Sequence, residues 1–427
     1  MTPATLDPQL RKPKALLMKR TAPLALALIA SACVAATAHA ATIKVATGKD
    51  AQERLQTALI DAKPGDVIAL GAGKFDLTDG LSLDVNDVTV KGAGQDKTTL
   101  DFTGQMGAGQ GLMVTSSRVT LRDFTVLNVK GDGIKAKASD QISFIDLTVA
   151  WSGPPKETNG AYGVYPVSSS NVLIERVTVR GASDAGIYVG QSKNIIVRNS
   201  KAEFNVAGIE IENSTDADVY DNVATHNAGG ILVFDLPNLP VQGGHSHRIY
   251  NNKIVDNDTP NFAPKGNIVA SVPTGTGVML MANRDVHVFG NTISGNQSAG
   301  VIVTGYKREI KDAAYEPLAR DIVVRDNTFG RNGWAPAIPG APEFGKMAPN
   351  GIPPILWDGA THFTRVGKGE DRKVNVVFKQ GPVLKLNLAD VNDLASAKPA
   401  VMATVDGAVV PERAKVVLPA GQAKLSN

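Results

Sequence analysis

Two glutamates and two tyrosines lie in short segments that share the pattern glycine, apolar, any residue, apolar: Tyr165, Tyr188, Glu210 and Glu212. If each segment is a β-strand, its apolar residues point to one side and the intervening residues to the other. Glu210 and Glu212 then lie on one strand face, with their Cβ atoms roughly 6.5–7 Å apart. This separation suits the paired carboxyl groups of glycoside hydrolysis. Tyrosine rings beside an acid also suit a sugar-binding groove, because rings stack on sugar faces and acids bind hydroxyl groups. A solvated sheet surface is the alternative interpretation, because Tyr and Glu are ordinary residues there.

A long interval between two of these segments supplies four further candidates. One stretch runs from Asp235 to His247 and includes His245, and a second, residues 258–267, includes Lys265. We expect both to be loops that wall one end of a site along the tyrosines and glutamates, because loops on a rigid scaffold often carry function. The two histidines lie on one face if the chain is extended, but a third certain metal ligand and an HExxH pattern are missing. We therefore predict neither a metal nor a cofactor.

A 22-residue repeat indicates which elements position these residues. Gly186, Gly208 and Gly230 each open a short apolar strand, and further copies occur at wider intervals on both sides. Pairs of asparagines five residues apart follow the repeat, at Asn222/Asn227, Asn252/Asn257, Asn291/Asn296 and Asn327/Asn332, with Ser200/Asn205 as a degenerate copy. A fixed period of this length indicates a solenoid. Stacked asparagines are expected to hydrogen-bond their copies in adjacent coils, so Asn222, Asn252, Asn291 and Asn327 are predicted to share one corner.

These coils resemble the right-handed parallel β-helix of the pectate-lyase-like superfamily. The resemblance implies an all-β fold, a single-stranded right-handed parallel β-helix over residues 65–360. A leucine-rich repeat is the alternative, but it requires a helical segment after each strand, and no sustained 3.6-residue periodicity is present between the coils.

Stacking of the coils predicts two columns of outward side chains. Tyr165, Tyr188 and Glu210 would be consecutive rungs, with neighbouring strands about 4.8 Å apart. The full columns are Lys135, Tyr165, Tyr188, Glu210, Leu232, Met279 and Ile302, and Lys137, Val167, Gly190, Glu212, Phe234, Met281 and Thr304. We expect both columns to face solvent.

The segment Tyr162-Gly-Val-Tyr-Pro-Val167 resembles the tyrosine-glycine-apolar-aspartate-proline-histidine motif of mannuronan C5-epimerases. Where that motif has an acid and an imidazole, this chain has Tyr165 and Val167. Abstraction of a sugar C5 proton needs a base and a group that neutralises the carboxylate. Epimerisation by that family's mechanism is therefore not expected.

The two ends of the chain differ from the repeat. Residues 1–40 are predicted to be a signal peptide, because a basic cluster precedes the apolar run 22–32 and the cleavage pattern Ala38-His39-Ala40. A transmembrane anchor is the alternative, but the apolar run is too short to span a bilayer. We expect a periplasmic or secreted protein, with a lipoprotein anchored through Cys33 as the alternative.

Removal of residues 1–40 changes the charge of the chain. This segment holds five of the 44 Lys and Arg residues and one of the 41 Asp and Glu residues, which leaves 39 basic and 40 acidic side chains. The mature chain thus lacks the positive charge that nucleic-acid binding requires, and we expect no nucleic-acid partner and no transmembrane segment.

Residues 41–64 are predicted to form an N-terminal capping segment. The stretch 50–62 is amphipathic, and Pro64 with Gly65 ends it. An open solenoid end exposes apolar residues and needs a cap. At the other end, residues 361–427 are predicted to form strands at 374–378 and 383–388, followed from Ala395 by a loosely ordered tail.

The whole pattern also resembles exported bacterial β-helix repeat proteins without an assigned biochemical role, some of them encoded beside a periplasmic c-type cytochrome. That resemblance implies such a cytochrome as a partner, while the chain has no CxxCH motif with which to bind haem covalently. We expect a monomer whose groove holds a polysaccharide or a periplasmic protein without catalysis. The alternative is a carbohydrate-active enzyme: a polysaccharide lyase, an epimerase or a glycoside hydrolase.

Overall fold

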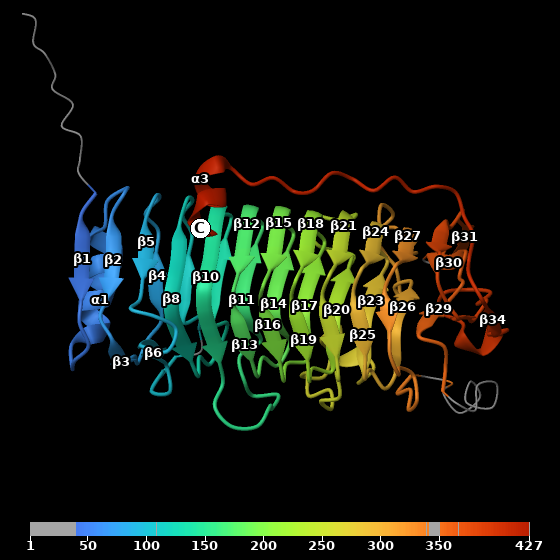
Figure 1. Ribbon diagram of the computed structural model, residues 1–427, viewed down its shortest axis with the longest axis horizontal. Helices are drawn as coiled ribbons and strands as arrows, with labels where there is room; N and C mark the ends of the chain where they lie inside the picture. The colour runs from blue at the N-terminus through green and yellow to red at the C-terminus, as the bar shows by residue number, and fades with distance from the viewer. Residues whose placement is uncertain (1–39, 108, 339, 341–350, 366, 427) are drawn as a thin grey trace, which may run out of the picture. The chain divides into compact units, whose positions relative to one another are not determined.

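The computed structural model describes residues 40–107, 109–338, 340, 351–365 and 367–426 (Figure 1). The predicted signal peptide up to residue 39, and Cys33 within it, lie outside the described residues.

The described chain folds into a parallel β-helix made of two long sheets. Sheet B has one strand per coil: β4 Leu81–Leu83, β7 Leu112–Val114, β9 Ile134–Lys137, β11 Tyr162–Val167, β14 Ala185–Gly190, β17 Ala207–Glu212, β20 Gly229–Phe234, β23 Thr276–Met281, β26 Ala299–Thr304, β29 Ile355–Trp357, β33 Val383–Lys385 and the antiparallel β34 Ala400–Met402.

Sheet A supplies the other faces of the coils. Its strands are β1 Thr42–Val45, β2 Val67–Leu70, β3 Gly73–Asp76, β5 Thr89–Lys91, β6 Thr98–Asp101, β8 Thr120–Leu127, β10 Asp140–Ala150, β12 Ser170–Glu175, β13 Thr178–Arg180, β15 Lys193–Arg198, β16 Lys201–Glu203, β18 Thr215–Tyr220, β19 Val223–Thr225, β21 His245–Tyr250, β22 Lys253–Val255, β24 Arg284–Phe289, β25 Thr292–Ser294, β27 Arg320–Arg325, β28 Thr328–Phe329 and β32 Val376–Phe378. A separate hairpin pairs β30 His362–Arg365 with β31 Lys368–Asp371. Parallel pairing thus begins at β1 and continues to β33, a wider span than the predicted residues 65–360.

The inward apolar positions of the repeat form one continuous core. In β14 and β17 these are Ile187, Val189, Ile209 and Ile211, all fully buried in the same cluster as residues of sheet A. The alternation predicted from the sequence therefore correctly assigns the inner face of sheet B.

The predicted asparagine stack is confirmed. Asn222 donates its backbone and side-chain N–H groups to Oδ1 of Asn252, each at 3.0 Å, and Asn252 repeats this pattern with Asn291, as does Asn291 with Asn327. A second, parallel stack joins Asn205, Asn227, Asn257, Asn296 and Asn332. The degenerate copy also takes part, since the Ser200 amide donates to Asn222.

The helix α1, Ala51–Asp61, follows β1 and packs against β1, β3 and β4. Ala51, Leu55 and Leu59 are buried in the core cluster. Other short helices among the described residues are α3 Ala420–Ala423 and the 3₁₀ turns η1 Val269–Ser271, η2 Leu394–Ser396 and η3 Lys424–Ser426.

The C-terminal tail is ordered against the solenoid, so the expectation of a loose tail is wrong. It runs back along sheet A and ends in α3 beside β10 and β12 (Figure 1). Glu412 pairs with Arg248 and Arg325, and Gln422 donates to the carbonyl oxygens of Ile142 and Asn171. These contacts join residues between 87 and 280 positions apart in sequence, which local sequence patterns do not reveal.

We predict that Arg413→Ala loosens this tail. The Arg413 guanidinium donates to Asp218 at 2.7 Å and to the Ser246 carbonyl at 2.6 Å. Its loss leaves the buried Asp218 and the half-buried Ser246 with fewer partners. Hydrogen exchange of residues 412–425 should accelerate while the coils stay protected. Lys415→Ala, at an exposed tail residue, is the control; equal exchange in both variants would contradict the prediction.

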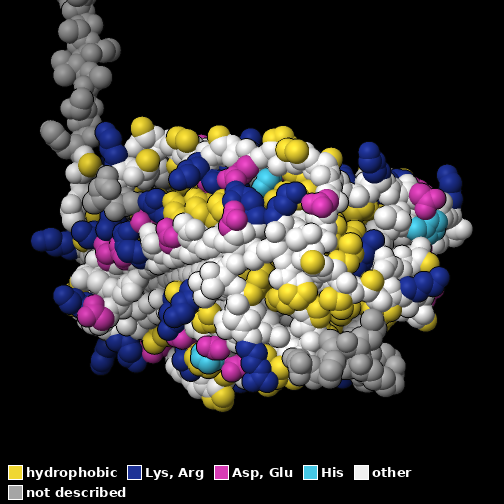
Figure 2. Space-filling view, turned by 45° about the vertical axis from the view of Figure 1, so that its right-hand side comes forward, with side chains coloured by type: hydrophobic (Ala, Val, Ile, Leu, Met, Phe, Trp, Pro, Cys, Tyr) yellow, Lys and Arg dark blue, Asp and Glu magenta, His cyan; other side chains and the backbone are white. Residues whose placement is uncertain are grey.

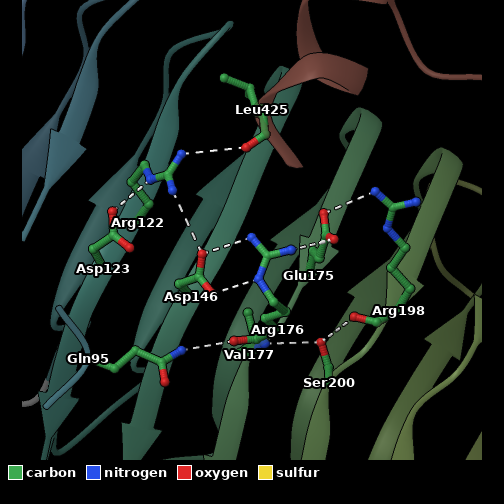
Figure 3. Close-up of polar contacts among 10 residues, drawn as sticks. All are labelled: Gln95, Arg122, Asp123, Asp146, Glu175, Arg176, Val177, Arg198, Ser200 and Leu425. Carbon is green, nitrogen blue, oxygen red and sulfur yellow. Dashed lines mark hydrogen bonds and ion pairs between the residues drawn. The ribbon is translucent and has the colours of Figure 1, made fainter. Parts of the chain in front are cut away.

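Charged side chains on the outer face of sheet A largely balance one another. Arg176 contacts Asp146 at 2.7 Å and Glu175 at 2.6 Å, Arg198 contacts Glu175 at 3.1 Å, and Arg122 reaches the Leu425 carbonyl (Figure 3). Figure 2 likewise shows basic and acidic side chains interspersed on the face in view. The charge pattern seen there differs from the continuous basic stripe that nucleic-acid binding uses.

Candidate functional site

The two predicted columns lie on the outer face of sheet B. The strand register pairs Lys135 with Tyr165, Tyr188 with Glu210, and Glu210 with Leu232. The second column is equally regular, with Gly190 opposite Glu212 and Glu212 opposite Phe234. The 22-residue repeat thus brings the predicted tyrosines and glutamates together.

The expected solvent exposure is wrong for these columns from β14 onwards, whereas Lys137 on β9 is exposed. Tyr188 is only 5% exposed, Glu210 1% and Glu212 6%. Their face is covered by residues outside the repeat, which form a second apolar cluster with Tyr188, Leu232, Phe234, Met279, Met281 and Ile302; the covering residues include Val269, Val272, Tyr306, Tyr315, Leu318 and Leu386. The insertions and the C-terminal segment therefore turn an outer face into a covered site.

Three tyrosines gather at the start of this site. The ring centroids of Tyr162 lie 4.5 Å from those of both Tyr165 and Tyr188, and Tyr165 lies 4.9 Å from Tyr188 at a near-perpendicular angle. Burial raises the pKa of Tyr165 to about 12 and that of Tyr188 well above its ordinary value. All three hydroxyl groups are therefore neutral donors near neutral pH.

Tyr188 orients Glu212. Its hydroxyl donates to Oε1 of Glu212 at 2.6 Å. The ring reaches this position by lying across Gly190, where an added Cβ would come within 2.5 Å of the ring. The glycine in the second column is thus a steric requirement of the Tyr188 position.

Glu210 is the most deeply buried acid of the site. Burial, followed by the negative charges of Glu212 and Asp184, raises the pKa of Glu210 well above its ordinary value. Among the described residues no hydrogen-bond partner contacts either carboxyl oxygen of Glu210. Burial and the crowding of like charges therefore favour the neutral, protonated form of Glu210.

Asp184 immediately precedes β14 and completes the acid cluster. Burial and the charge of Glu212 raise its pKa to about 7. Two donors oppose this rise: Asn267 Nδ2 lies 3.0 Å from Oδ2, and the Tyr162 hydroxyl lies 3.5 Å from the same atom. Asp184 therefore changes protonation near neutral pH, which suits a general acid.

Asp235 follows β20 at the far side of the cluster. Its carboxyl group accepts hydrogen bonds from the Gly243 amide at 3.1 Å and the Gly244 amide at 2.9 Å, and burial raises its pKa to about 6. These bonds hold the loop that follows β20. One full strand, β17, separates β14, which Asp184 precedes, from β20, which Asp235 follows.

The two histidines do not wall the site. They belong to strand β21 of sheet A rather than to a loop. His247 points into the solenoid, in register with Ala217 and Val286, and burial lowers its pKa to about 3. His245 is half-buried and contacts Ser246 Oγ at 2.8 Å. A left-handed backbone at Ser246, with φ of 65°, breaks the alternation assumed for an extended chain.

Lys265 stays exposed on the insertion between β22 and β23. The nearby Asn267 enters the site instead, through its contact with Asp184. The insertion thus contacts the acid cluster through Asn267 rather than through Lys265.

The site becomes more exposed towards β9. Tyr162, Tyr165 and Lys135 are half-buried, and Lys137 is exposed. Lys135 Nζ lies 4.3 Å from the centre of the Tyr165 ring and 3.3 Å from Asp132 Oδ2. Exposure of the site therefore increases from the buried acid cluster towards the tyrosine rings and Lys135.

Three residues of the site were missed or undervalued from the sequence. Tyr162 opens the epimerase-like motif, yet only its fourth and sixth positions were considered. Asp184 lies outside the strand pattern, and Asn267 comes from an insertion that the repeat does not describe. No cluster of three or more potential metal ligands occurs within the part of the chain that the structure describes. None of the helices there is both long and apolar enough to cross a membrane.

We predict that Glu210→Gln makes stability less dependent on pH. Between the ordinary pKa of a glutamate, about 4.3, and the raised folded value, the folded protein keeps a proton that the unfolded chain releases, so stability falls as pH rises. Glutamine does not titrate. The Tm of the parent should therefore fall further than that of Glu210→Gln between pH 5 and 8, by about 2 °C or more.

The comparison of the two proteins also cancels the opposing contribution of His247, which is common to both. Because its folded pKa is lowered, His247 contributes stability that is lost as pH falls below its unfolded value. Parallel Tm curves for parent and variant would contradict the assignment of a neutral Glu210.

Comparisons with known proteins agree with this architecture. A family model described as right handed beta helix region matches residues 110–257. A search of curated proteins finds no match. The predicted right-handed parallel β-helix is thus confirmed as the fold.

Solved structures of the same fold cover most of the chain at low identity. The A-module of the mannuronan C-5 epimerase AlgE4 of Azotobacter vinelandii is 20% identical, with a TM-score of 0.51, over 70% of this chain and 80% of that one. The DFA-IIIase of Arthrobacter chlorophenolicus A6, solved without its lid, is 13% identical, with a TM-score of 0.52, over 82% and 96%. Identities this low establish the shared fold and leave the chemistry to the residues of the site.

Proposed function

We propose that this protein is a carbohydrate-active enzyme that cleaves or transfers a glycosidic bond in the acid cluster of sheet B. The observation that carries the proposal is the pairing of Asp184 with Glu212 beside three tyrosines. Two carboxyl groups with different surroundings, one titrating near pH 7 and one held by Tyr188, are what glycosidic bond cleavage needs. This proposal replaces the non-catalytic groove as the favoured function.

Asp184 is assigned the role of general acid. Its pKa of about 7 leaves a substantial protonated fraction at neutral pH, so it can protonate the oxygen of the leaving group. Asn267 and Tyr162 hold the carboxyl group in place.

Glu212 is assigned the role of carboxylate partner. The hydrogen bond from Tyr188 opposes the rise in pKa that burial causes, so it favours the ionised form. Ionised Glu212 can activate water or attack the sugar, and Glu210 holds the neighbouring proton. The exposed edges of Tyr162 and Tyr165 provide surfaces on which a sugar ring can stack.

The charge of the site favours a neutral sugar over a uronate. Asp132, Asp184 and Glu212 lie close enough to Tyr165 for their charges to raise its pKa. The cation that contacts this ring, Lys135, already pairs with Asp132. A uronate carboxylate placed here would meet like charges without a free partner. Lyase or epimerase chemistry, which must neutralise that carboxylate, therefore has weaker support.

A paired substrate panel tests the proposal. Neutral glycans, including fructans, DFA-III and α- and β-glucans, should yield new reducing ends or transfer products, detected by chromatography and proton NMR. Mannuronan and polygalacturonate should yield neither unsaturated uronate nor epimerised residues. Binding without turnover on every neutral glycan would favour the non-catalytic groove, and turnover of uronates alone would overturn the neutral-sugar assignment.

Export to the periplasm or the medium is part of the proposal. It rests on the basic and apolar pattern of residues 1–40. N-terminal sequencing of the processed protein should begin at Ala41, whereas a lipid-modified Cys33 would show the alternative route.

The proposal also includes the role of α1 at the N-terminal end, the oligomeric state and the partner of the protein. α1 would cover the open apolar end of the solenoid, which its buried residues Leu55 and Leu59 support. A monomeric state and a c-type cytochrome partner stay predictions, which sedimentation and co-purification can check.

A further inference from the structure

A cavity opens on sheet B, two coils beyond Glu210. It has a volume of about 330 Å³. Its floor is formed by the outward residues Met279, Met281, Ile302 and Leu356, each at most 9% exposed. The walls come from outside the repeat and are formed by Ile268, Pro273, Ile338, Leu386 and Leu394. The cavity is therefore apolar on its floor and on two sides.

The charged residues that line this cavity are both cationic. Lys307 and Arg308 lie side by side at its rim and are exposed. Arg308 contacts the carbonyl oxygens of Gly266 and Asn267 at 3.5 and 3.4 Å, which are neutral partners. Within the described parts of the chain no ion pair is recorded at either residue, although Glu309 pairs with Lys311 next to them at 3.7 Å.

We propose that this cavity binds an amphiphile with an apolar body and an anionic head, such as an alkyl carboxylate or an aryl sulfonate. The apolar floor and walls contact the apolar body of the ligand, and Lys307 and Arg308 bind its anionic head group. Charge complementarity selects an anion over a cation or a neutral amphiphile. The volume is about twice that of a 150 Å³ apolar cavity that binds benzene, which suits two fused rings or a medium-length alkyl chain.

This site is separate from the proposed glycosidic site. The acid cluster is built on β14, β17 and β20, while the floor of the cavity is built on β23, β26 and β29. Neither cation contacts the acids directly. Amphiphile binding can therefore be measured without any glycan and without turnover.

The experiment measures binding of anilinonaphthalene sulfonate to the folded protein by fluorescence titration. Competition then compares dodecanoate with dodecyltrimethylammonium and dodecanol. Dodecanoate should displace the probe best, with an affinity that falls as salt increases. Equal displacement by the anion and the cation would overturn the proposal.

Charge-reversal variants locate the head group. Lys307→Glu combined with Arg308→Glu should weaken dodecanoate about tenfold, whereas Lys311→Glu, at an exposed and already paired lysine outside the lining, should bind like the parent. An equal loss in both variants would show a diffuse charge effect and overturn the site.

Variants that fill the cavity test whether the apolar body of the ligand binds inside it. Ile302→Trp places a larger side chain on the cavity floor and should abolish binding. Ser271→Trp should fill the cavity from its exposed rim. This second variant serves for the test if Ile302→Trp fails to fold. Undiminished binding in a folded filling variant would contradict the proposal.

Discussion

Glu212→Gln is expected to lower kcat/KM for a neutral glycan by a factor on the order of 10³, with little change in the melting temperature. Glutamine keeps an oxygen that accepts the hydrogen bond from Tyr188. It cannot carry the negative charge that activates water or attacks the sugar. The loss should therefore appear in the chemical step, and glycan binding should change less than turnover.

Glu203→Gln is the matched control for this experiment. Glu203 lies on β16 of sheet A, partly exposed and paired with Lys201 at 2.8 Å. It should retain parental activity. If Glu212→Gln keeps as much activity as this control while both stay folded, Glu212 has no catalytic role.

Asn252→Ala is expected to produce the largest loss of stability among the single substitutions considered. The Oδ1 atom of Asn252 accepts two hydrogen bonds from Asn222, and its Nδ2 donates to the Val219 carbonyl at 2.9 Å. Alanine leaves these buried groups without their partners, at a cost of at least about 1–3 kcal/mol. Chemical denaturation monitored by circular dichroism measures this change.

Asn392→Ala provides the comparison at an exposed asparagine outside the ladders. Its effect should stay within about 0.5 kcal/mol. A midpoint for Asn252→Ala that matches this control would show that the ladder adds little to stability.

The sequence predicts strand register and stacking best in the repeated segments. Each coil places equivalent positions in register. Asn222, Asn252 and Asn291 are 30 and 39 residues apart, but each is followed five residues later by a second asparagine, and this pair marks them as equivalent. The same rule placed Tyr188 opposite Glu210 and Gly190 opposite Glu212. Fold and register thus follow from local, repeated interactions.

Burial of the site could not be predicted in the same way. Tyr188 belongs to an apolar cluster with Val272 and Tyr315, which lie in insertions without a period. Asn267 reaches Asp184 across 83 residues of sequence. His247 turned inward because one left-handed residue, Ser246, shifted the alternation. Such contacts depend on how long insertions fold back, which no short pattern records.

The pH dependence of turnover in Asn267→Ala tests the central claim most directly. If Asp184 is the general acid, parental activity on a neutral glycan should fall as pH rises through about 7, because the acid must be protonated. The hydrogen bond from Asn267 lowers the pKa of Asp184, so its removal should move this alkaline limb to higher pH. Lys265→Ala, at an exposed residue of the same insertion, should leave the profile unchanged. An alkaline limb that does not move in Asn267→Ala, or that moves equally in Lys265→Ala, would contradict the assignment of Asp184 and with it the proposed glycosidic site.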